Sequence, residues 1–285
     1  MVTEFKIAHP EPFLEIRIKD VSITPHLYNF CAGYEMGEWR SEQLAEHVME
    51  WLPEFALKYS EWKNIGSSNA VRLIKKAAKL IFESDDFKSR GEFGEILLHI
   101  MIRQSFSTIP AISKIYYKDS RNDTVKGFDC VHTVFVNNKF ELWLGEAKFY
   151  SDIYKAISDV IQELEHHTTR NYLRDEFIAI TNKIDSEWPY SEKLKSLLDP
   201  NTSLDKIFEA TCIPVLLTYD SKTINNHSKV TDEFTKDMEK EIRNFYKLFS
   251  SKNLPQNIKI YLFLFPLKDK KDLNQRLYDN LQRLN

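Results

Sequence analysis

The charges best suited to catalysis follow an apolar run in the stretch Leu142–Tyr150 (LWLGEAKFY). Alternate side chains of a strand point to the same side, so Glu146 and Lys148 continue an apolar face that begins at Leu142. Both faces begin apolar, which predicts a central strand buried on both sides. Buried charges are costly unless they are paired or bind a metal, so the carboxyl end of this strand is a candidate functional site. The alternative is a structural salt bridge at the end of the strand.

A second carboxylate stands one predicted strand earlier, in Gly127–Cys130 (GFDC). Asp129 precedes the apolar residues of that strand and continues one of its core faces. If the two strands form a hairpin around residues 137–139, the start of one lies beside the end of the other. This pairing predicts that Asp129 lies next to Glu146 and Lys148.

The helix predicted over residues 91–106 adds acids in its first turns. Glu92 and Glu95 are three residues apart and lie on one side of the helix. An acid at a helix N-terminus also stabilises the helix dipole, which explains Glu92 well and Glu95 less well. Gly94 costs about 1 kcal/mol relative to Ala inside a helix, so we expect it to permit close packing beside these acids.

Acids converging with a lysine have the chemistry of phosphodiester hydrolysis. Asp129, Glu146 and the main-chain carbonyl of Ala147 can hold Mg²⁺, with Mn²⁺ as an alternative. The metal would polarise a phosphate, and Lys148 would stabilise its charge and orient or deprotonate the attacking water. A helix carboxylate, Glu95 or Glu92, would support the metal or its waters. The candidate catalytic residues are therefore Glu92, Glu95, Asp129, Glu146 and Lys148, and the candidate metal ligands are Glu95, Asp129, Glu146 and Ala147.

The elements that position these residues form an alternating pattern. After the helix over 91–106, we predict strands over 111–118, 127–136, 140–149, 213–219 and 258–265, and helices over 153–167, 232–249 and beyond 272. A charged excursion is expected over residues 181–205. This order predicts an α/β fold with a mixed sheet flanked by helices on both faces.

The N-terminal region differs in character and predicts a mainly helical subdomain for partner contact or regulation. Its expected elements are a strand over 13–21, a helix over 41–59 broken or kinked at Pro53, and a basic helix over 71–81. We therefore divide the chain into residues 1–85 and residues 86–285, the second carrying the candidate site. No linker composition marks this boundary.

Composition excludes several classes of protein. With 42% hydrophobic and 28% charged residues among 285, the chain is neither disordered nor a fibre nor a coiled-coil rod. Its 39 Lys+Arg and 42 Asp+Glu give a net charge of −3, so nucleic-acid binding would need a local basic patch. The charged start, the lack of a long apolar run and three scattered cysteines predict a soluble cytoplasmic protein with reduced thiols and no membrane partner.

The motif set resembles the PD-(D/E)XK nuclease core, with Glu95 on a helix, Asp129 on a following strand and Glu146-Ala-Lys148 on the next. Phe128 stands where that family usually has Pro, which removes no ligand. The stretches GEFGE (91–95), GFD (127–129) and LGEAK (144–148) are also similar to the HamA family, the nuclease component of bacterial Hachiman anti-phage systems. The resemblance covers about residues 80–285. It implies DNA as substrate, a HamB-like helicase partner and a role as the effector of a defence complex.

Other interpretations remain open at this stage. The chain could be a catalytically silent nuclease-like module that binds DNA or scaffolds a helicase, or an interaction domain with structural ion pairs. His166 and His167 lie close to Glu163 and Glu165 but lack the HExxH pattern, and neighbouring helix residues diverge, so we expect a solvated helix face there. The chain has no P-loop motif and is not expected to hydrolyse ATP by that route.

Overall fold

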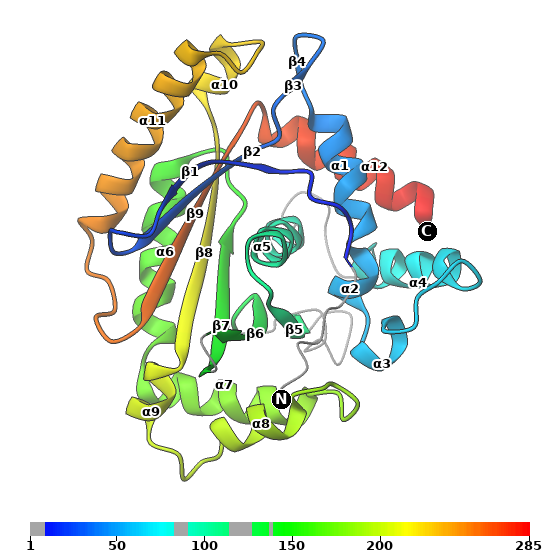
Figure 1. The fold of residues 1–285 in the computed structure, drawn as a ribbon, viewed down its shortest axis with the longest axis vertical. Coiled ribbons are helices and arrows are strands. Elements are labelled where there is room, and N and C mark those ends of the chain that lie inside the picture. The colour runs from blue at the N-terminus through cyan, green and yellow to red at the C-terminus, as the bar shows by residue number, and fades with distance from the viewer. Residues whose placement is uncertain (1–8, 83–90, 114–126, 137–138) are drawn as a thin grey trace.

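The computed structural model describes residues 9–82, 91–113, 127–136 and 139–285 (Figure 1). A seven-stranded mixed sheet runs through the molecule in the order β1-β2-β9-β8-β7-β6-β5, and a small hairpin, β3-β4, stands apart from it. The strands are β1 Glu15–Asp20, β2 His26–Cys31, β3 Tyr34–Glu35, β4 Glu38–Trp39, β5 Ile109–Ser113, β6 Cys130–Val136, β7 Lys139–Lys148, β8 Thr211–Asp220 and β9 Lys259–Leu267.

Twelve helices are described around these sheets. They are α1 Ser41–Glu50, α2 Leu52–Ala56, α3 Tyr59–Trp62, α4 Ala70–Phe82, α5 Glu92–Ser105, α6 Ile153–His167, α7 Arg170–Lys183, α8 Ser191–Leu197, α9 Leu204–Glu209, α10 Lys222–Asn226, α11 Asp232–Ser250 and α12 Lys270–Leu284. None of the helices within the described ranges is both long and apolar enough to cross a membrane.

The centre of the sheet is parallel. β2, β9, β8 and β7 run in the same direction, and β6 and β5 continue the sheet antiparallel beyond β7. β8 and β9 are nearly continuous apolar runs whose residues are almost all buried, as strands covered on both faces must be. The carboxyl ends of β2, β7, β8 and β9 therefore share one edge of the sheet, which we call the carboxyl edge.

Helices cover both faces of the sheet, as predicted. α5 and α6 both pack on β7 and β8, and Figure 1 shows them on opposite sides of the sheet. The buried stripe of α6 is Ile153, Ala156, Ile157, Val160 and Leu164. Burial of this stripe determines which side of α6 faces the end of β7.

The N-terminal region contributes two strands to the main sheet. β2 was not expected from the sequence, and it pairs in parallel with β9 over His26–Asn29. α1 packs on α12 from the other end of the chain. The predicted division between residues 85 and 86 lies outside the described residues, and the sheet itself includes strands from both predicted parts.

Two segments differ in detail from the predicted elements. The helix predicted over 41–59 breaks at Trp51, and Pro53 lies in the first turn of α2, where its missing N–H costs nothing. The charged segment 181–205 is partly helical: the end of α7, all of α8 and the start of α9 lie within it, and Trp188 is buried. Its apolar residues pack inward, although its composition is that of an exposed loop.

Candidate active site

The β6–β7 hairpin brings the predicted acids together. Cys130 is paired with Gly145, and the Asp129 main-chain N–H donates to the Gly145 carbonyl at 2.8 Å. The Asp129 carboxylate accepts a hydrogen bond of 2.8 Å from the Ala147 main-chain N–H. The predicted juxtaposition of Asp129 with the end of β7 is therefore confirmed, although turn residues 137–138 lie outside the described residues.

Glu146 and Lys148 are buried at the carboxyl edge, with 1% and 8% of their surface exposed. Both side chains face α6. The Glu146 carboxylate forms an ion pair with Nδ1 of His167, and the Lys148 ammonium forms one with Glu163. Charges this deep require partners, and α6 supplies them.

The charge state of Lys148 follows from this environment. Burial acts to lower the pKa of its ammonium, but the hydrogen bond and charge of Glu163, with the charges of Asp129 and Glu146, outweigh burial. The pKa of Lys148 is therefore raised above its ordinary value, and the side chain is a cation at neutral pH.

Glu92 and Glu95 are both buried in the first turn of α5. Burial raises the pKa of the Cys130 thiol well above its usual value, and the charges of Asp129, Glu95 and Glu146 raise it further. The carboxylate of Glu95 on α5 thus acts on the same region as the two strand acids, although α5 covers the opposite face of the sheet from α6.

Two glycines let α5 and β6 approach β7 at this point. A Cβ on Gly94 would lie 2.9 Å from Cβ of Phe149 and 3.5 Å from Cβ of Ala147. A Cβ on Gly145 would clash with Sγ of Cys130 and lie 2.8 Å from Cδ2 of Leu98. The expectation that Gly94 permits close packing beside the acids is confirmed.

Glu163 and His167 were expected to lie on a solvated helix face, and for these two residues that prediction is wrong, because they pair with Lys148 and Glu146. Glu165 and His166 are exposed as expected, but the His167 ring is stacked on Tyr172 at 4.3 Å and lies 5.3 Å from Phe128. The correction has a simple cause: positions 163 and 167 flank and extend the buried stripe of α6, one helical turn apart. The spacing follows from the sequence, whereas the docking of α6 that brings both residues to β7 does not.

A further buried acid supports the loop before β6. Glu176 of α7 accepts a 3.3 Å hydrogen bond from the Phe128 main-chain N–H. A Cβ on Gly127 would come within 3.0 Å of both Glu176 carboxylate oxygens, so the glycine of the GFD motif makes room for this acid. The segment that carries Asp129 is thereby anchored to α7.

The donors at this edge fit a hard divalent cation. Asp129 and Glu146 offer carboxylate oxygens from neighbouring strands, and Ala147 lies between Glu146 and Lys148 with a main-chain carbonyl, which is the oxygen-rich set that Mg²⁺ prefers. As the side chains stand, however, no group of three or more His, Cys, Asp or Glu residues in the described ranges is arranged to hold a metal ion.

Comparison with known proteins places the chain in a family. The HamA family model matches residues 8–281. The chain belongs to the HamA family. A curated relative, anti-bacteriophage protein A of Escherichia coli (strain K12), is 21% identical over 258 residues, which is 88% of this chain. The chain spans about half the length of that relative, 47%. The family match covers the N-terminal strands as well as the candidate site.

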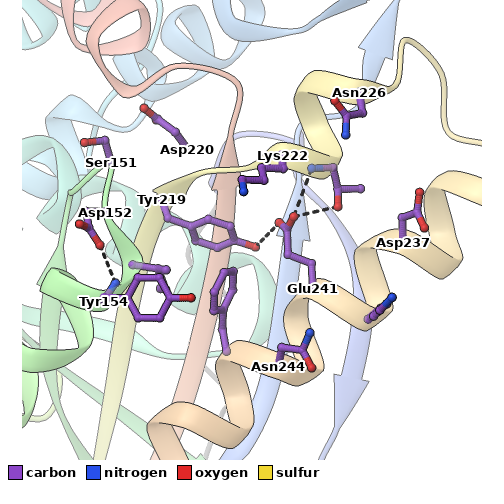
Figure 2. A pocket seen from close by; sticks show the side chains of 14 residues that line it. Ser151, Asp152, Tyr154, Tyr219, Asp220, Lys222, Asn226, Asp237, Glu241 and Asn244 are labelled. Atoms are coloured by element: carbon purple, nitrogen blue, oxygen red, sulfur yellow. Dashed lines mark hydrogen bonds between the residues drawn. The ribbon is translucent and has the colours of Figure 1, made fainter.

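A groove of about 750 Å³ in this HamA-family chain begins at Ser151, just after the end of β7, and none of the candidate catalytic residues lines it (Figure 2). It is lined by the start of α6, the end of β8, α10 and α11. Glu241 of α11 accepts hydrogen bonds from the Tyr219 hydroxyl at 3.0 Å and from both the main-chain N–H and the hydroxyl of Thr223, at 3.1 and 2.8 Å. These contacts fix α10 and α11 on the end of β8 and hold this wall of the groove in place.

Proposed function

We propose that this chain is a metal-dependent deoxyribonuclease with a PD-(D/E)XK-type core, acting in anti-phage defence. The observation that carries the proposal is the meeting of Asp129, Glu146 and Lys148 at the carboxyl edge of a mainly apolar sheet. A protein that only needed stability would gain little from burying these charges, because apolar side chains of similar volume serve as well or better.

Each residue has a role in this proposal. Asp129, Glu146 and the Ala147 carbonyl would hold Mg²⁺ or Mn²⁺, with Glu95, or less directly Glu92, supporting the ion or its waters. When bound, the metal would polarise the scissile phosphate and lower the pKa of the attacking water. Lys148, kept cationic, would stabilise the charge that develops on the phosphate and orient that water.

The helices on either side would position these groups. Glu163 would hold the Lys148 ammonium in place, and His167 would hold the Glu146 carboxylate. The order of helix α5, strands β5, β6 and β7, helix α6 and strand β8 also supports the nuclease assignment, since it matches the elements expected for this core from the sequence.

The defence role and the partner rest on family membership. The E. coli relative is named an anti-bacteriophage protein, and the resemblance to HamA implies a HamB-like helicase and DNA as substrate. We propose that the chain works as the effector subunit of such a complex. The relative is about twice as long, so its activity is carried over only as part of this proposal.

The test is degradation of linear and circular DNA by the purified chain, with Mg²⁺ or EDTA, alone and with a co-purified helicase. We expect Mg²⁺-dependent cleavage that falls by about 10²- to 10³-fold in Lys148→Ala, because an electrostatic stabiliser of the transition state is lost. Lys195→Ala is the matched control: Lys195 also forms an ion pair, with Glu192, but on the solvent-facing side of α8, outside the candidate site.

Each outcome separates the interpretations. Cleavage lost in Lys148→Ala but kept in Lys195→Ala, with equal melting temperatures, supports the nuclease. If Lys148→Ala unfolds instead, the buried charges serve as structural ion pairs. This is the main alternative, because Lys148 pairs with Glu163 and Glu146 pairs with His167. DNA binding without cleavage under every condition would leave a catalytically silent helicase-scaffolding subunit.

A further inference from the structure

A second hollow, of about 540 Å³, lies at the carboxyl edge three strands away from the candidate active site. Its walls are the start of β1, the segment 33–40 that contains the β3-β4 hairpin, and loop 228–230 between α10 and α11. Its volume falls within the range of small-molecule sites, roughly 300–1,000 Å³. We call it the hairpin hollow.

Two arginines line this hollow, one at an irregularity of β1 and one directly after the β3-β4 hairpin. Arg17 sits where the β1–β2 register shifts between Ile16 and Ile18, and such a bulge turns a side chain out of the regular alternation. Arg40 follows the hairpin, and its guanidinium is stacked 4.3 Å from the ring centre of Phe13. Both guanidinium groups are therefore held in place before any ligand arrives.

The donors of these arginines are incompletely used. Nε of Arg17 and Nε of Arg40 are buried, and neither has a hydrogen-bond partner among the described residues. Arg17 forms an ion pair of 2.6 Å with Glu15, whereas Arg40 and Lys229 form no ion pair within the described ranges. Unused cationic donors around a hollow are typical of an anion site.

The charge of the hollow departs from that of the whole chain. Arg17, Arg40 and Lys229 line it against a single acid, Glu15, whereas the chain as a whole carries a net charge of −3. The hollow is thus a local basic patch of the kind that a near-neutral protein needs to hold a phosphate. It was not foreseen because its cations are far apart in the sequence.

The rim of the hollow is apolar and exposed. Met36 is fully exposed at the tip of the hairpin and adopts a positive φ of 51°, a conformation that favours Gly or Asn. Val230 is also exposed. Tyr34 lines the hollow as a half-buried side chain, and its hydroxyl donates to the Ile224 carbonyl at 2.7 Å. An exposed apolar side chain in a strained turn lowers the stability of the fold, and such features are often found at functional sites.

We propose that the hairpin hollow binds one nucleotide unit, with its phosphate on Arg17, Arg40 and Lys229 and its base against Tyr34, Met36 and Val230. The combination of fixed cations with a flat aromatic and a flexible thioether fits a ligand that is anionic at one end and apolar at the other. Such a unit can come from a free nucleotide or from a nucleic-acid strand. The site is distinct from the cleavage chemistry proposed above and does not depend on it.

The place of the hollow suits either source. β2 and β7 are separated by β9 and β8, so their carboxyl ends lie roughly 14 Å apart at about 4.8 Å per strand. A strand held at the candidate active site would pass close to the hollow, whereas a free nucleotide there would be bound against the hairpin and loop 228–230.

The test measures binding to the full-length chain in EDTA, so that cleavage plays no part. The probes are a short fluorescein-labelled single-stranded DNA and free AMP. Lys229→Gln should weaken binding by about tenfold and lower the slope of log K against log salt by about 0.7, as expected for one lost phosphate contact. Lys252→Gln is the control of equal charge change, since exposed Lys252 follows α11 at the opposite edge of the sheet.

The two probes separate the sources of the phosphate. If Lys229→Gln weakens AMP binding, the ligand is a free nucleotide; if it weakens only the oligonucleotide, the ligand is part of a strand. Arg40→Gln, checked for an unchanged melting temperature, should reproduce the effect. Binding of both probes that is equal in Lys229→Gln and Lys252→Gln overturns the proposal and leaves the nuclease assignment untouched.

Discussion

At the scale of single residues, a chain of buried polar side chains begins one turn beyond Glu95 on α5. Nε2 of His99 lies 3.1 Å from the Glu54 carboxylate, and Nδ1 of His99 lies 3.1 Å from Nε2 of His132. Nδ1 of His132 lies 3.1 Å from the Thr108 hydroxyl. Arg103 donates to Glu54 at 2.6 Å. This network ties α2 to α5 and β6 immediately behind the candidate site.

The network assigns one proton to each histidine. Glu54 can only accept, so Nε2 of His99 carries a hydrogen and Nδ1 accepts from His132. Nδ1 of His132 then accepts from the Thr108 hydroxyl. Burial lowers the pKa of both imidazoles. In His132 the positive charge that His99 would carry if it were protonated, and the charge of Arg103, lower the pKa further. At neutral pH both rings are therefore uncharged in the folded chain.

Replacing His132 should reduce the loss of stability on acidification. Unfolded histidine takes up a proton as pH falls below its ordinary pKa of 6.5, whereas folded His132 does not, so falling pH favours the unfolded chain. Below that pH the free energy of unfolding falls by up to about 1.4 kcal/mol per pH unit for each such histidine. His132→Gln removes the contribution of one histidine to this pH dependence. Urea unfolding at about pH 7.5 and about pH 5.5 measures the difference.

His166→Gln is the control for this comparison, because His166 is an exposed histidine on α6. Its free energy of unfolding should depend on pH as the wild type's does. An equal pH dependence in His132→Gln and the wild type would show that His132 is protonated in the folded chain, contrary to the neutral network.

At the scale of elements, the approach of α5 to β7 depends on Gly94. An added methyl group there would meet Cβ of Phe149 at 2.9 Å, a backbone-proximal atom that cannot move aside alone. Gly94→Ala should therefore destabilise the chain by about 1–3 kcal/mol through overpacking, less the roughly 1 kcal/mol that Ala gains in a helix. It should also lower cleavage by shifting Glu95.

Gly91→Ala is the matched change at the start of the same helix, where a Cβ would meet nothing within 4 Å. It should alter the free energy of unfolding by no more than about 0.5 kcal/mol. Urea unfolding and the cleavage rate are compared for both variants. A Gly94→Ala chain as stable and active as Gly91→Ala would mean that α5 does not rest on Gly94 as described.

The sequence predicted elements whose signal is local. The bounds of α6, Ile153–His167, are those expected, and the β6–β7 register followed from a hairpin between adjacent strands. β2 was missed because Asn29 interrupts its apolar pattern. The Asn29 side chain is buried and donates at 3.1 Å to the carbonyl of Leu264, a residue 235 positions away that no local pattern reveals.

The same distinction explains the candidate site. Asp129, Glu146 and Lys148 could be placed together because one hairpin relates them. Glu163 and His167 reach them only through the docking of α6 across the sheet, which depends on packing against distant strands. The hairpin hollow is formed by three segments that are far apart in the sequence, so the spacing of residues could not predict it.

At the scale of the whole molecule, the sheet joins the two predicted parts of the chain. β9 pairs on one side with β8 and on the other with β2, and its residues are almost all buried. A fragment of residues 86–285 would lose β2 and leave this apolar strand as an open edge. Exposed apolar edges pair with other chains, so such a fragment should aggregate.

We expect residues 86–285 to be insoluble when expressed alone and to become soluble when residues 1–85 are co-expressed, because β2 and α1 then cover β9 and α12. Soluble yield, gel filtration and the cooperativity of thermal unfolding measure this. A fragment that is monomeric and unfolds cooperatively by itself would make the N-terminal region an appended subdomain, as the sequence first predicted.

If the fragment instead needs residues 1–85 to be soluble, the N-terminal region must fold together with the nuclease-like part. The N-terminal region also forms most of the hairpin hollow. Any nucleotide bound in the hollow would then stabilise the folded sheet as a whole, and with it the strand end that carries Glu146 and Lys148.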